Sequence, residues 1–295
     1  MSDFFTSFKQ RLSAREPRTI LLTINVTVFL LFTILKILLA TSGGSGTFAA
    51  ALFWFDNIFS FRTDFSFFLT HPWTIITSIF THYTFEHIFF NMLMFYFTSE
   101  MFVYFFGSRK LVWVYLLGGI TGNLLELLAG FLISGGAHPI SIIGASGSVM
   151  AIFMAVALYK PQLKVKLFGI FEVKIIYLAA FYFLWDFTRI GINDGIAHFA
   201  HLGGALIGFL SSRHVQSPSN ILNRTDALWK SLTQRKSGLK KPVQGKRPVS
   251  DDVYNANKKA KQDRVDAILD KISRHGYEGL TAEEKDFLFN QSNRR

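Results

Sequence analysis

The sequence predicts an all-α, polytopic membrane protein: a bundle of six transmembrane helices followed by a small cytoplasmic helical tail. Half of the 295 residues are hydrophobic, 33 are Phe, and only 17% are charged. This composition is the reverse of that of intrinsically disordered chains. The formal net charge is +11, and the positive excess is densest in the polar segment after residue 213. The absence of Cys excludes disulfide bonds, thiol nucleophiles and Cys-ligated metal centres.

A hydrocarbon core of about 30 Å is crossed by roughly 20 apolar residues, and six apolar stretches are predicted as spans; the fourth is too short to cross, so its N-terminus is expected to begin inside the membrane. The six stretches are residues 19–40, 87–106, 111–133, 146–159, 168–187 and 196–210. The first is too long for a cleavable signal peptide and has no small-residue cleavage site. A further aromatic segment, residues 48–68, is interrupted by Asp56, Arg62 and Asp64. We interpret it as a loop in the membrane interface, where aromatic rings are enriched, with a further span as the alternative.

Basic residues near the ends of the spans indicate the topology. They precede the first span, separate the second from the third and the fourth from the fifth, and follow the sixth: Lys9, Arg11, Arg15, Arg18, Arg109, Lys110, Lys160, Lys164, Lys166 and Arg213. The loops on the opposite side carry only Arg62 and Arg189. By the positive-inside rule, both termini are expected in the cytoplasm, with the protein in the plasma (inner) membrane.

These boundaries divide the chain into four parts. We expect a cytoplasmic N-terminal segment (1–18), a six-span membrane domain (19–213), a basic polar linker (214–262) and a small helical hairpin (263–295). The linker is expected to meet anionic lipid or to be a solvated linker rather than to bind nucleic acid, because it follows a span on the cytoplasmic side. Thr281 and Glu284 have the spacing of a capping box, which predicts the start of the second helix of the hairpin.

Polar side chains within membrane spans are costly and therefore suggest functional sites. His87 and Asn91 are four residues apart and share one face of the second span. The fourth span opens with Ser146, and the sixth contains His201. Measured at 1.5 Å per residue from the predicted cytoplasmic ends of their helices, Ser146, His201 and Asn91 lie about 9, 12 and 6 Å below the outer surface. These side chains are therefore predicted to occupy one layer of the membrane.

A serine beside a neutral imidazole can perform nucleophilic acyl transfer, with the histidine acting first as base and then as acid. Ser146 is the predicted nucleophile and His201 its base, and His198 is the alternative base. The backbone N–H of Ser146, the Asn91 amide and the His87 imidazole are candidate donors to the oxyanion. We find no carboxylate or thiol ligand set beside the histidines, so no metal site is expected, and the chemistry requires no cofactor.

Glycines around the predicted site are expected to be structural. Gly144 and Gly147 permit a tight turn at a depth where non-helical backbone must be buried in protein or face a water-filled cavity. Gly204 and Gly208 form a small-xxx-small pair suited to close packing of one transmembrane helix on another. If the fourth and sixth helices touch at these glycines, the serine and the histidine can meet.

With these residues in place, the sequence resembles bacterial members of the rhomboid family of intramembrane serine proteases over about residues 70–212. The family pattern combines H-x-x-x-N on the second helix, G-x-S-G opening the fourth and A-H-x-x-G-x-x-x-G on the sixth, and all three occur here in that order. The resemblance implies a Ser146/His201 dyad with no acidic third member. It also implies an oxyanion site from His87, Asn91 and backbone amides, a structural role for His82, and transmembrane proteins as substrates.

The sequence departs from the family pattern at three positions. Trp73 is followed by Thr74 where Arg is frequent, and Val103 stands where a Glu is usual. Met150 replaces an aromatic residue that often packs on the catalytic histidine. Glu126 is a charged residue within a span to which the sequence assigns no function.

Two other functions are compatible with these residues. A catalytically silent rhomboid-like protein would bind membrane clients through the same fold, and it would not react with a fluorophosphonate at Ser146. A proton-coupled transporter would use the buried histidines as a relay, although the internal repeat typical of many transporters is missing from the sequence. The sequence does not indicate the substrate, the pathway or the oligomeric state.

Overall fold

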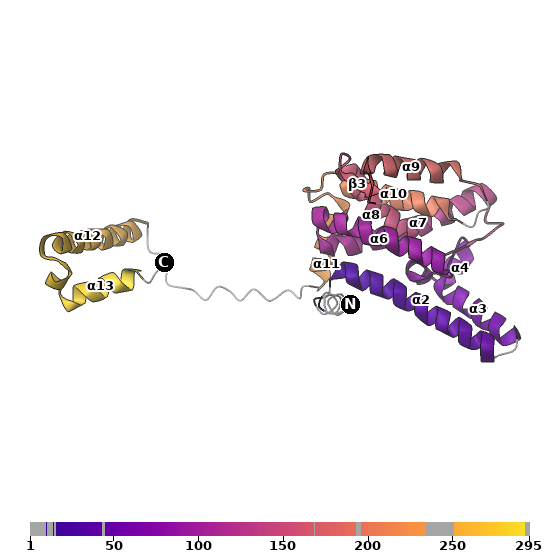
Figure 1. Ribbon diagram of the computed structural model, residues 1–295, viewed down its shortest axis with the longest axis horizontal. Coiled ribbons are helices and arrows are strands. Elements are labelled where there is room, and N and C mark those ends of the chain that lie inside the picture. Colours follow the sequence, from indigo (N-terminus) through magenta and orange to yellow (C-terminus); the bar gives the residue numbers. More distant parts are fainter. Residues whose placement is uncertain are drawn as a thin grey trace. The chain divides into compact units, whose positions relative to one another are not determined.

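The computed structural model describes residues 10, 14, 16–42, 45–167, 169–192, 196–233 and 251–292 (Figure 1). Most of the predicted N-terminal segment and the central part of the predicted linker, residues 234–250, lie outside the described residues. The chain divides into two units, Met1–Thr233 and Gln234–Arg295, which are described separately below.

The first unit is a helical membrane bundle, which confirms the predicted fold class. Its helices are α2 (Pro17–Ser42), α3 (Ser45–Phe59), α4 (Phe65–Thr70), α5 (Thr74–Thr77), η1 (Ser78–Phe80), α6 (Phe85–Phe106), α7 (Ser108–Ser134), α8 (Ser146–Tyr159), α9 (Ile175–Thr188), α10 (His198–Ser212) and α11 (Ile221–Thr233). Three of the described helices, α2, α6 and α7, are long and apolar enough to cross a membrane on their own. The shorter α8, α9 and α10 complete the bundle around the predicted site residues.

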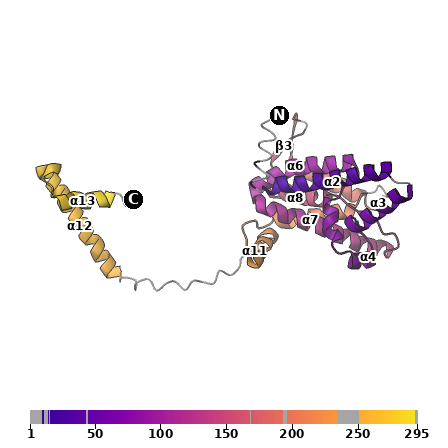
Figure 2. The same ribbon diagram turned by 90° about the horizontal axis from the view of Figure 1, so that it is seen from below.

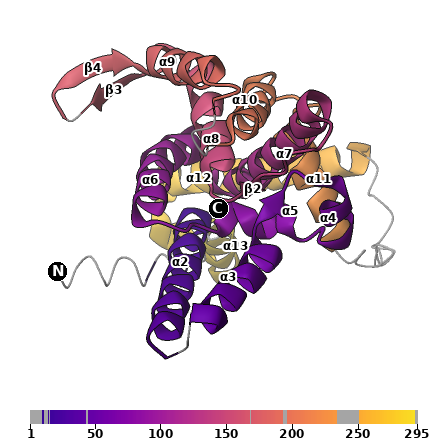
Figure 3. The same ribbon diagram turned by 90° about the vertical axis from the view of Figure 1, so that its right-hand side faces the viewer.

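Helix α8 lies at the centre of this bundle, in contact with α6, α7 and α10 (Figure 3). Its residues from Gly147 to Ala157 are all buried. At 1.5 Å per residue its 14 residues extend about 21 Å, less than a hydrocarbon core of about 30 Å. Because an apolar helix of this kind is surrounded by protein on all sides, its position is determined by packing rather than by lipid.

The predicted fifth span, residues 168–187, begins too early. A β-hairpin of β3 (Lys164–Leu167) and β4 (Phe171–Lys174) precedes α9, and Val165 pairs with Val173 in its register. Lysines alternate with apolar residues in β3, which is the period-two pattern of a strand and not the pattern of a span. The helix therefore starts only at Ile175.

The aromatic segment 48–68, interpreted as an interfacial loop, is largely helical. Its first part is α3, which packs against α2 (Figure 2), with Phe55 stacked on Phe32 at 3.9 Å between ring centroids. The 15 residues of α3 extend about 22 Å, too short to cross the membrane. Strand β1 (Phe61–Arg62) follows and pairs with β2 (Ser141–Ile142), which joins this segment to the residues just before α8.

A helix also occupies part of the predicted basic linker. Helix α11 packs against α7, where Trp229 contacts Trp113 edge-on at 5.7 Å between ring centroids. Asp226 of α11 forms ion pairs with Arg109 and Lys230. The start of the tail is thus attached to the same end of the bundle as the turn between α6 and α7.

The second unit is a helical hairpin of α12 (Asp251–His275) and α13 (Ala282–Ser292), joined by η2 (Tyr277–Gly279). The predicted capping box is confirmed, because the Thr281 N–H donates to Glu284 Oε2 at 2.8 Å and the Glu284 N–H donates to Thr281 Oγ1 at 3.3 Å. Lys271 of α12 donates to the same Glu284 carboxylate at 3.0 Å and links the two helices.

Candidate active site

Ser146 is the first residue of the central helix. It is half-buried, whereas the neighbouring Ser148 is fully buried and donates its hydroxyl to the Tyr115 carbonyl at 2.6 Å. Helix α8 has no side-chain N-cap, so backbone N–H groups of its first turn lack a helical partner. An accessible hydroxyl at a helix N-terminus is well placed for nucleophilic attack beside a developing negative charge.

Gly144 brings the predicted oxyanion donors against the turn that precedes Ser146. Its φ of +110° is disfavoured for other residues, and an added Cβ would lie only 2.6 Å from His87 Nε2 and 3.8 Å from Asn91 Nδ2. The Asn91 amide donates one hydrogen to the His87 carbonyl at 2.9 Å, which fixes its orientation. Both predicted donors therefore lie next to the turn that carries Ser146.

His82 supports the same turn through a hydrogen bond to its backbone. Its side chain is fully buried, and its Nε2 accepts a hydrogen bond from the Ala145 N–H at 3.3 Å. Its ring also meets the His87 ring edge-on at 4.9 Å between centroids. His82 therefore contacts both the residue before Ser146 and one of the predicted oxyanion donors.

Helices α8 and α10 touch backbone to backbone beside Ser146. A Cβ added at Gly204 would overlap the carbonyl of Gly147, and one added at Gly208 would lie 2.7 Å from the Ala151 oxygen. This close contact places His201, one turn before Gly204, on the face of α10 that points to the start of α8. Within the described part of the chain, no hydrogen bond joins the Ser146 hydroxyl to His201, and such bonds often tighten only when substrate binds.

Sequence reasoning missed Asp186, an acidic residue on α9 that contacts both candidate bases. Its Oδ1 lies 3.0 Å from His201 Nδ1 and 2.7 Å from His198 Nδ1, and all three side chains are buried. The expectation that no carboxylate accompanies the histidines was therefore wrong. Asp186 lies 12 residues before His198 and 15 before His201 in the sequence. The only sequence signal for this contact was an acidic residue inside an apolar span.

These three residues are also a possible metal-ligand set. They offer one ligand atom each, all within 4.8 Å of one another. Two ligands at 2.0–2.1 Å on a tetrahedral zinc ion are roughly 3.3 Å apart, whereas 2.7 Å is the length of a charge-assisted hydrogen bond. The distances therefore fit hydrogen bonds to a carboxylate better than ligation of a metal.

Glu126, which had no predicted role, anchors the N-terminus of α10. Its Oε2 accepts a hydrogen bond from the Ala200 N–H at 2.9 Å, and the Phe199 N–H also donates to this carboxylate. A carboxylate at a helix N-terminus satisfies unpaired N–H groups and interacts favourably with the helix dipole. Glu126 therefore connects α7 to the first turn of α10, in which His201 lies.

An aromatic ring lies near His201 despite the Met150 departure. It belongs to Tyr182 of α9, whose ring centroid is 6.1 Å from that of His201, with an interplanar angle of 35°. Met150 itself is buried in the core of the bundle. The aromatic neighbour of the histidine thus comes from a different helix than the family pattern suggests.

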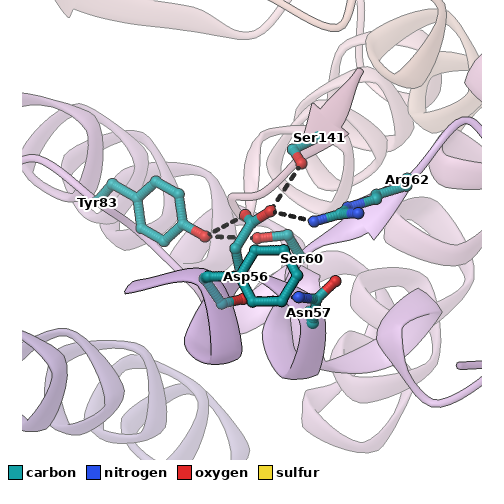
Figure 4. Close-up of polar contacts among 7 residues, drawn as sticks. Asp56, Asn57, Ser60, Arg62, Tyr83 and Ser141 are labelled. Carbon is teal, nitrogen blue, oxygen red and sulfur yellow. Dashed lines mark hydrogen bonds and ion pairs between the residues drawn. The ribbon is translucent and has the colours of Figure 1, made fainter. Parts of the chain in front are cut away.

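A polar cluster around Asp56 connects α3 and β1 with the loops that precede α6 and α8, as Figure 4 shows. Asp56 accepts hydrogen bonds from Tyr83 at 2.7 Å, Arg62 at 2.9 Å and Ser141 at 3.2 Å. Burial raises the pKa of Asp56, but hydrogen bonds from Tyr83, Ser60 and Arg62 outweigh burial and hold it below its usual value. The cluster ties α3 and β1 to the residues that precede both α6 and α8.

The loop that lacks the frequent Trp-Arg pair is thus anchored in another way. The Trp73 indole donates to the Ile58 carbonyl at 3.0 Å, at the end of α3. Arg62 of β1 lies over the ring of Phe67 in α4, with its Cζ 4.6 Å from the ring centroid, and it pairs with Asp56. Arg62 therefore supplies an arginine to the loop from a different position.

Taken together, the site combines a half-buried hydroxyl at a helix N-terminus, a histidine held by a carboxylate, and two side-chain donors beside the turn. Residues 69–216, half of the chain, match the Rhomboid domain. The chain belongs to the rhomboid family. The same region contains every residue of the site on α6, α7, α8, α9 and α10.

Three curated relatives support this membership. The chain is 32% identical to "Putative rhomboid protease YdcA" of Bacillus subtilis, over 48% of this chain and 65% of that protein. It is 30% identical to "Presenilin-associated rhomboid-like protein A, mitochondrial" of Danio rerio, over 45% and 35%, and to "RHOMBOID-like protein 12, mitochondrial" of Arabidopsis thaliana, over 47% and 45%. The matched region thus spans less than two thirds of each relative. Residues 250–294 match a family of unknown function, DUF6576.

Proposed function

We propose that this rhomboid is an intramembrane serine endopeptidase that hydrolyses peptide bonds in or near transmembrane segments of other proteins. The observation that carries the proposal is the backbone contact between Gly147 and Gly204. It brings the first turn of α8, with Ser146, against the turn of α10 that contains His201. The His87 and Asn91 side chains border Gly144, in the turn that leads into Ser146.

In the proposed mechanism, the Ser146 hydroxyl attacks the substrate carbonyl while His201 accepts its proton. The oxyanion is stabilised by the Ser146 N–H, His87 and Asn91, aided by the positive end of the α8 dipole. His201 then donates the proton to the leaving amine, and water hydrolyses the acyl-enzyme. No cofactor takes part in these steps.

The site lies at the end of the bundle opposite to its basic end. Lys160 at the end of α8 lies over the Phe105 ring near the end of α6, and Arg109 pairs with Asp226 of α11. Under the positive-inside rule this basic end faces the cytoplasm, so we assign both termini to the cytoplasm. The site then lies near the outer face of an inner membrane, where transmembrane substrates enter from the lipid.

The proposal is tested with purified protein in proteoliposomes that contain a single-span substrate. Ser146→Ala and His201→Ala are expected to abolish cleavage while thermal unfolding stays near that of the wild type. Ser148→Ala is the matched control, because the Ser148 hydroxyl is buried and bonded to a carbonyl, and it should retain cleavage. A fluorophosphonate should label the wild type and Ser148→Ala but not Ser146→Ala.

Cleavage that persists in Ser146→Ala would contradict the mechanism. A wild type that binds the substrate but neither cleaves it nor reacts with the fluorophosphonate would instead support a client-binding protein without catalytic activity.

A further inference from the structure

Asp186 is an acidic residue in direct contact with the proposed catalytic base. Its side chain is buried near the end of α9, and its Oδ1 lies within hydrogen-bonding distance of two ring nitrogens, His198 Nδ1 at 2.7 Å and His201 Nδ1 at 3.0 Å. Its Oδ2 is buried with no hydrogen-bond partner among the described residues. A buried carboxylate normally needs partners, and here both partners are imidazoles.

The position of Asp186 on α9 is unusual for that helix. Only Ile175, Ala179 and Asp186 of α9 are buried, and the first two lie in its first half. Large side chains beside Asp186, including Trp185 and Phe187, are exposed. The described contacts between this end of α9 and α10 include the hydrogen bonds of Asp186 and the neighbouring ring of Tyr182.

A hydrogen bond from Nδ1–H to a carboxylate determines which nitrogen of an imidazole carries the proton. If His201 donates Nδ1–H to Asp186, its Nε2 is the unprotonated nitrogen that can accept the Ser146 proton. The imidazolium that forms would stay next to the negative carboxylate, which stabilises it without accepting its proton. The proton then leaves from Nε2 to the amine of the departing peptide.

We propose that Asp186 is the positioning residue of this site, and that the protein works with a Ser146–His201–Asp186 arrangement in place of a simple dyad. This inference rests on the proposed protease function. Asp186 acts through His201: it orients the ring, sets the tautomer and couples the end of α9 to the catalytic histidine. His198 is the second donor to the same oxygen.

Among the described residues, the other ionisable groups around His201 come from α6, α7 and α9 and from its own helix, α10. They are His87 of α6, Glu126 of α7, His198 of α10 and Tyr182 of α9. Of these, only Glu126 is a carboxylate, and it is bonded to the backbone of α10. Asp186 is therefore the carboxylate that the described contacts place on the His201 ring.

The test compares Asp186→Asn and Asp186→Ala with the wild type in the proteoliposome assay. Both should lower kcat by up to about 10⁴-fold, the loss known for removal of the orienting carboxylate from a serine-protease triad, with KM unchanged. Asp226→Asn is the matched control, because it makes the same chemical change at an ion pair on the opposite end of the bundle. Thermal unfolding of each variant identifies losses that come from misfolding.

A second measurement does not depend on cleavage. In protein labelled with ¹⁵N-histidine, the His201 signals, assigned by comparison with His201→Gln, should show protonated Nδ1 and unprotonated Nε2. Asp186→Asn should shift this ring toward the Nε2-protonated tautomer. An unchanged tautomer together with an unchanged kcat would overturn the inference.

The outcomes also separate this inference from the proposed function. If the wild type cleaves, Ser146→Ala does not, and Asp186→Asn equals Asp226→Asn, the protease proposal stands and the role of Asp186 is refuted. If Ser146→Ala still cleaves, the protease mechanism itself fails, while the NMR measurement still tests the orientation of His201. Activity that is abolished by a chelator and restored by Zn²⁺ would overturn the inference in favour of metal ligation by the same residues.

Discussion

Helices α8 and α9 have the same length of 14 residues but opposite environments. Helix α8 is buried from Gly147 to Ala157 and contacts α6, α7 and α10. Helix α9 buries only three of its residues and exposes most of its large side chains. Each helix nevertheless contributes one residue to the proposed site, Ser146 from α8 and Asp186 from α9.

This difference separates two ways of holding a functional group. The position of Ser146 follows from packing along the whole of α8, so no single side chain determines it. The end of α9 depends on a few contacts with α10, of which the hydrogen bonds of Asp186 are the most directional. Changes that disturb packing should therefore affect α8 through stability, and changes near the end of α9 should affect activity more than stability.

The largest effect is expected where the packing of α8 is tightest. In Gly204→Ala the added Cβ would overlap the Gly147 carbonyl, so α8 and α10 must move apart. Such overpacking costs about 1–3 kcal/mol or more, and a displacement of about 1 Å between the serine and the histidine is enough to reduce catalysis strongly. We expect a lower Tm and nearly complete loss of cleavage.

Gly130→Ala is the control for this prediction. Its added Cβ would come no closer than 3.3 Å, to the side chain of Thr63, which can shift slightly. Wild-type cleavage and stability in Gly204→Ala would show that the contact between α8 and α10 is looser than the structure indicates.

A smaller effect is expected at the contact between α10 and α7. Glu126→Ala removes the carboxylate that accepts the Ala200 N–H, and loss of a helix cap costs about 1 kcal/mol. Because His201 lies in that first turn, kcat/KM should also fall, though less than in Asp186→Asn. Thermal unfolding and cleavage are measured on the same preparations.

The matched control is Glu172→Ala, which removes an exposed ion pair with Lys164 in the β-hairpin and should change stability by less than about 1 kcal/mol. Equal effects of the two changes would mean that Glu126 is not an anchor of α10.

The same contrast explains how far the sequence could be interpreted. The fold class and the close contact of α8 with α10 at Gly204 and Gly208 were predictable, because close helix packing requires small residues at fixed spacing, and that spacing can be read from the sequence. The contacts of Asp186 were not predictable. Its partners His198 and His201 lie on the next helix, beyond the connection between α9 and α10, and no sequence spacing links them to Asp186. The hairpin of β3 and β4 was missed for another reason. The predicted fifth span, residues 168–187, included β4, so the alternating pattern of the two strands was not recognised.

The role of Glu126 illustrates the same limit. An isolated charge in a span indicates a function, but only the structure shows that it meets the first N–H groups of another helix. Similarly, Met150 does not reveal that Tyr182 of α9 brings a ring to His201.

A modest effect is expected from the aromatic neighbour of His201. Tyr182→Leu removes the ring 6.1 Å from the His201 ring while keeping an apolar side chain on α9. Loss of such a ring contact is worth about 0.5–1.5 kcal/mol, so kcat should fall by roughly two- to tenfold with little change in Tm. Tyr177→Leu, an exposed position on the same helix, is the control. Identical kinetics in both variants would mean that α9 supports His201 through Asp186 alone.

The smallest effect is expected in the loops that precede α6 and α8, where pH should change stability through Asp56. The pKa of its carboxyl is lower in the folded protein than in the unfolded chain, where it is about 3.9. The ionised form therefore contributes stability that is fully present above about pH 4 and is lost as the pH falls through the lower, folded value. Asp56→Asn removes this contribution, so its Tm should depend less on pH than that of the wild type between about pH 5 and pH 3.

The difference in the free energy of unfolding between the two proteins should stay within about 1 kcal/mol, because the ion pair of Asp56 with Arg62 is partly exposed. Parallel pH profiles of the two proteins would show that the Asp56 cluster does not stabilise the loops that lead into α6 and α8, and that packing alone positions the start of α8.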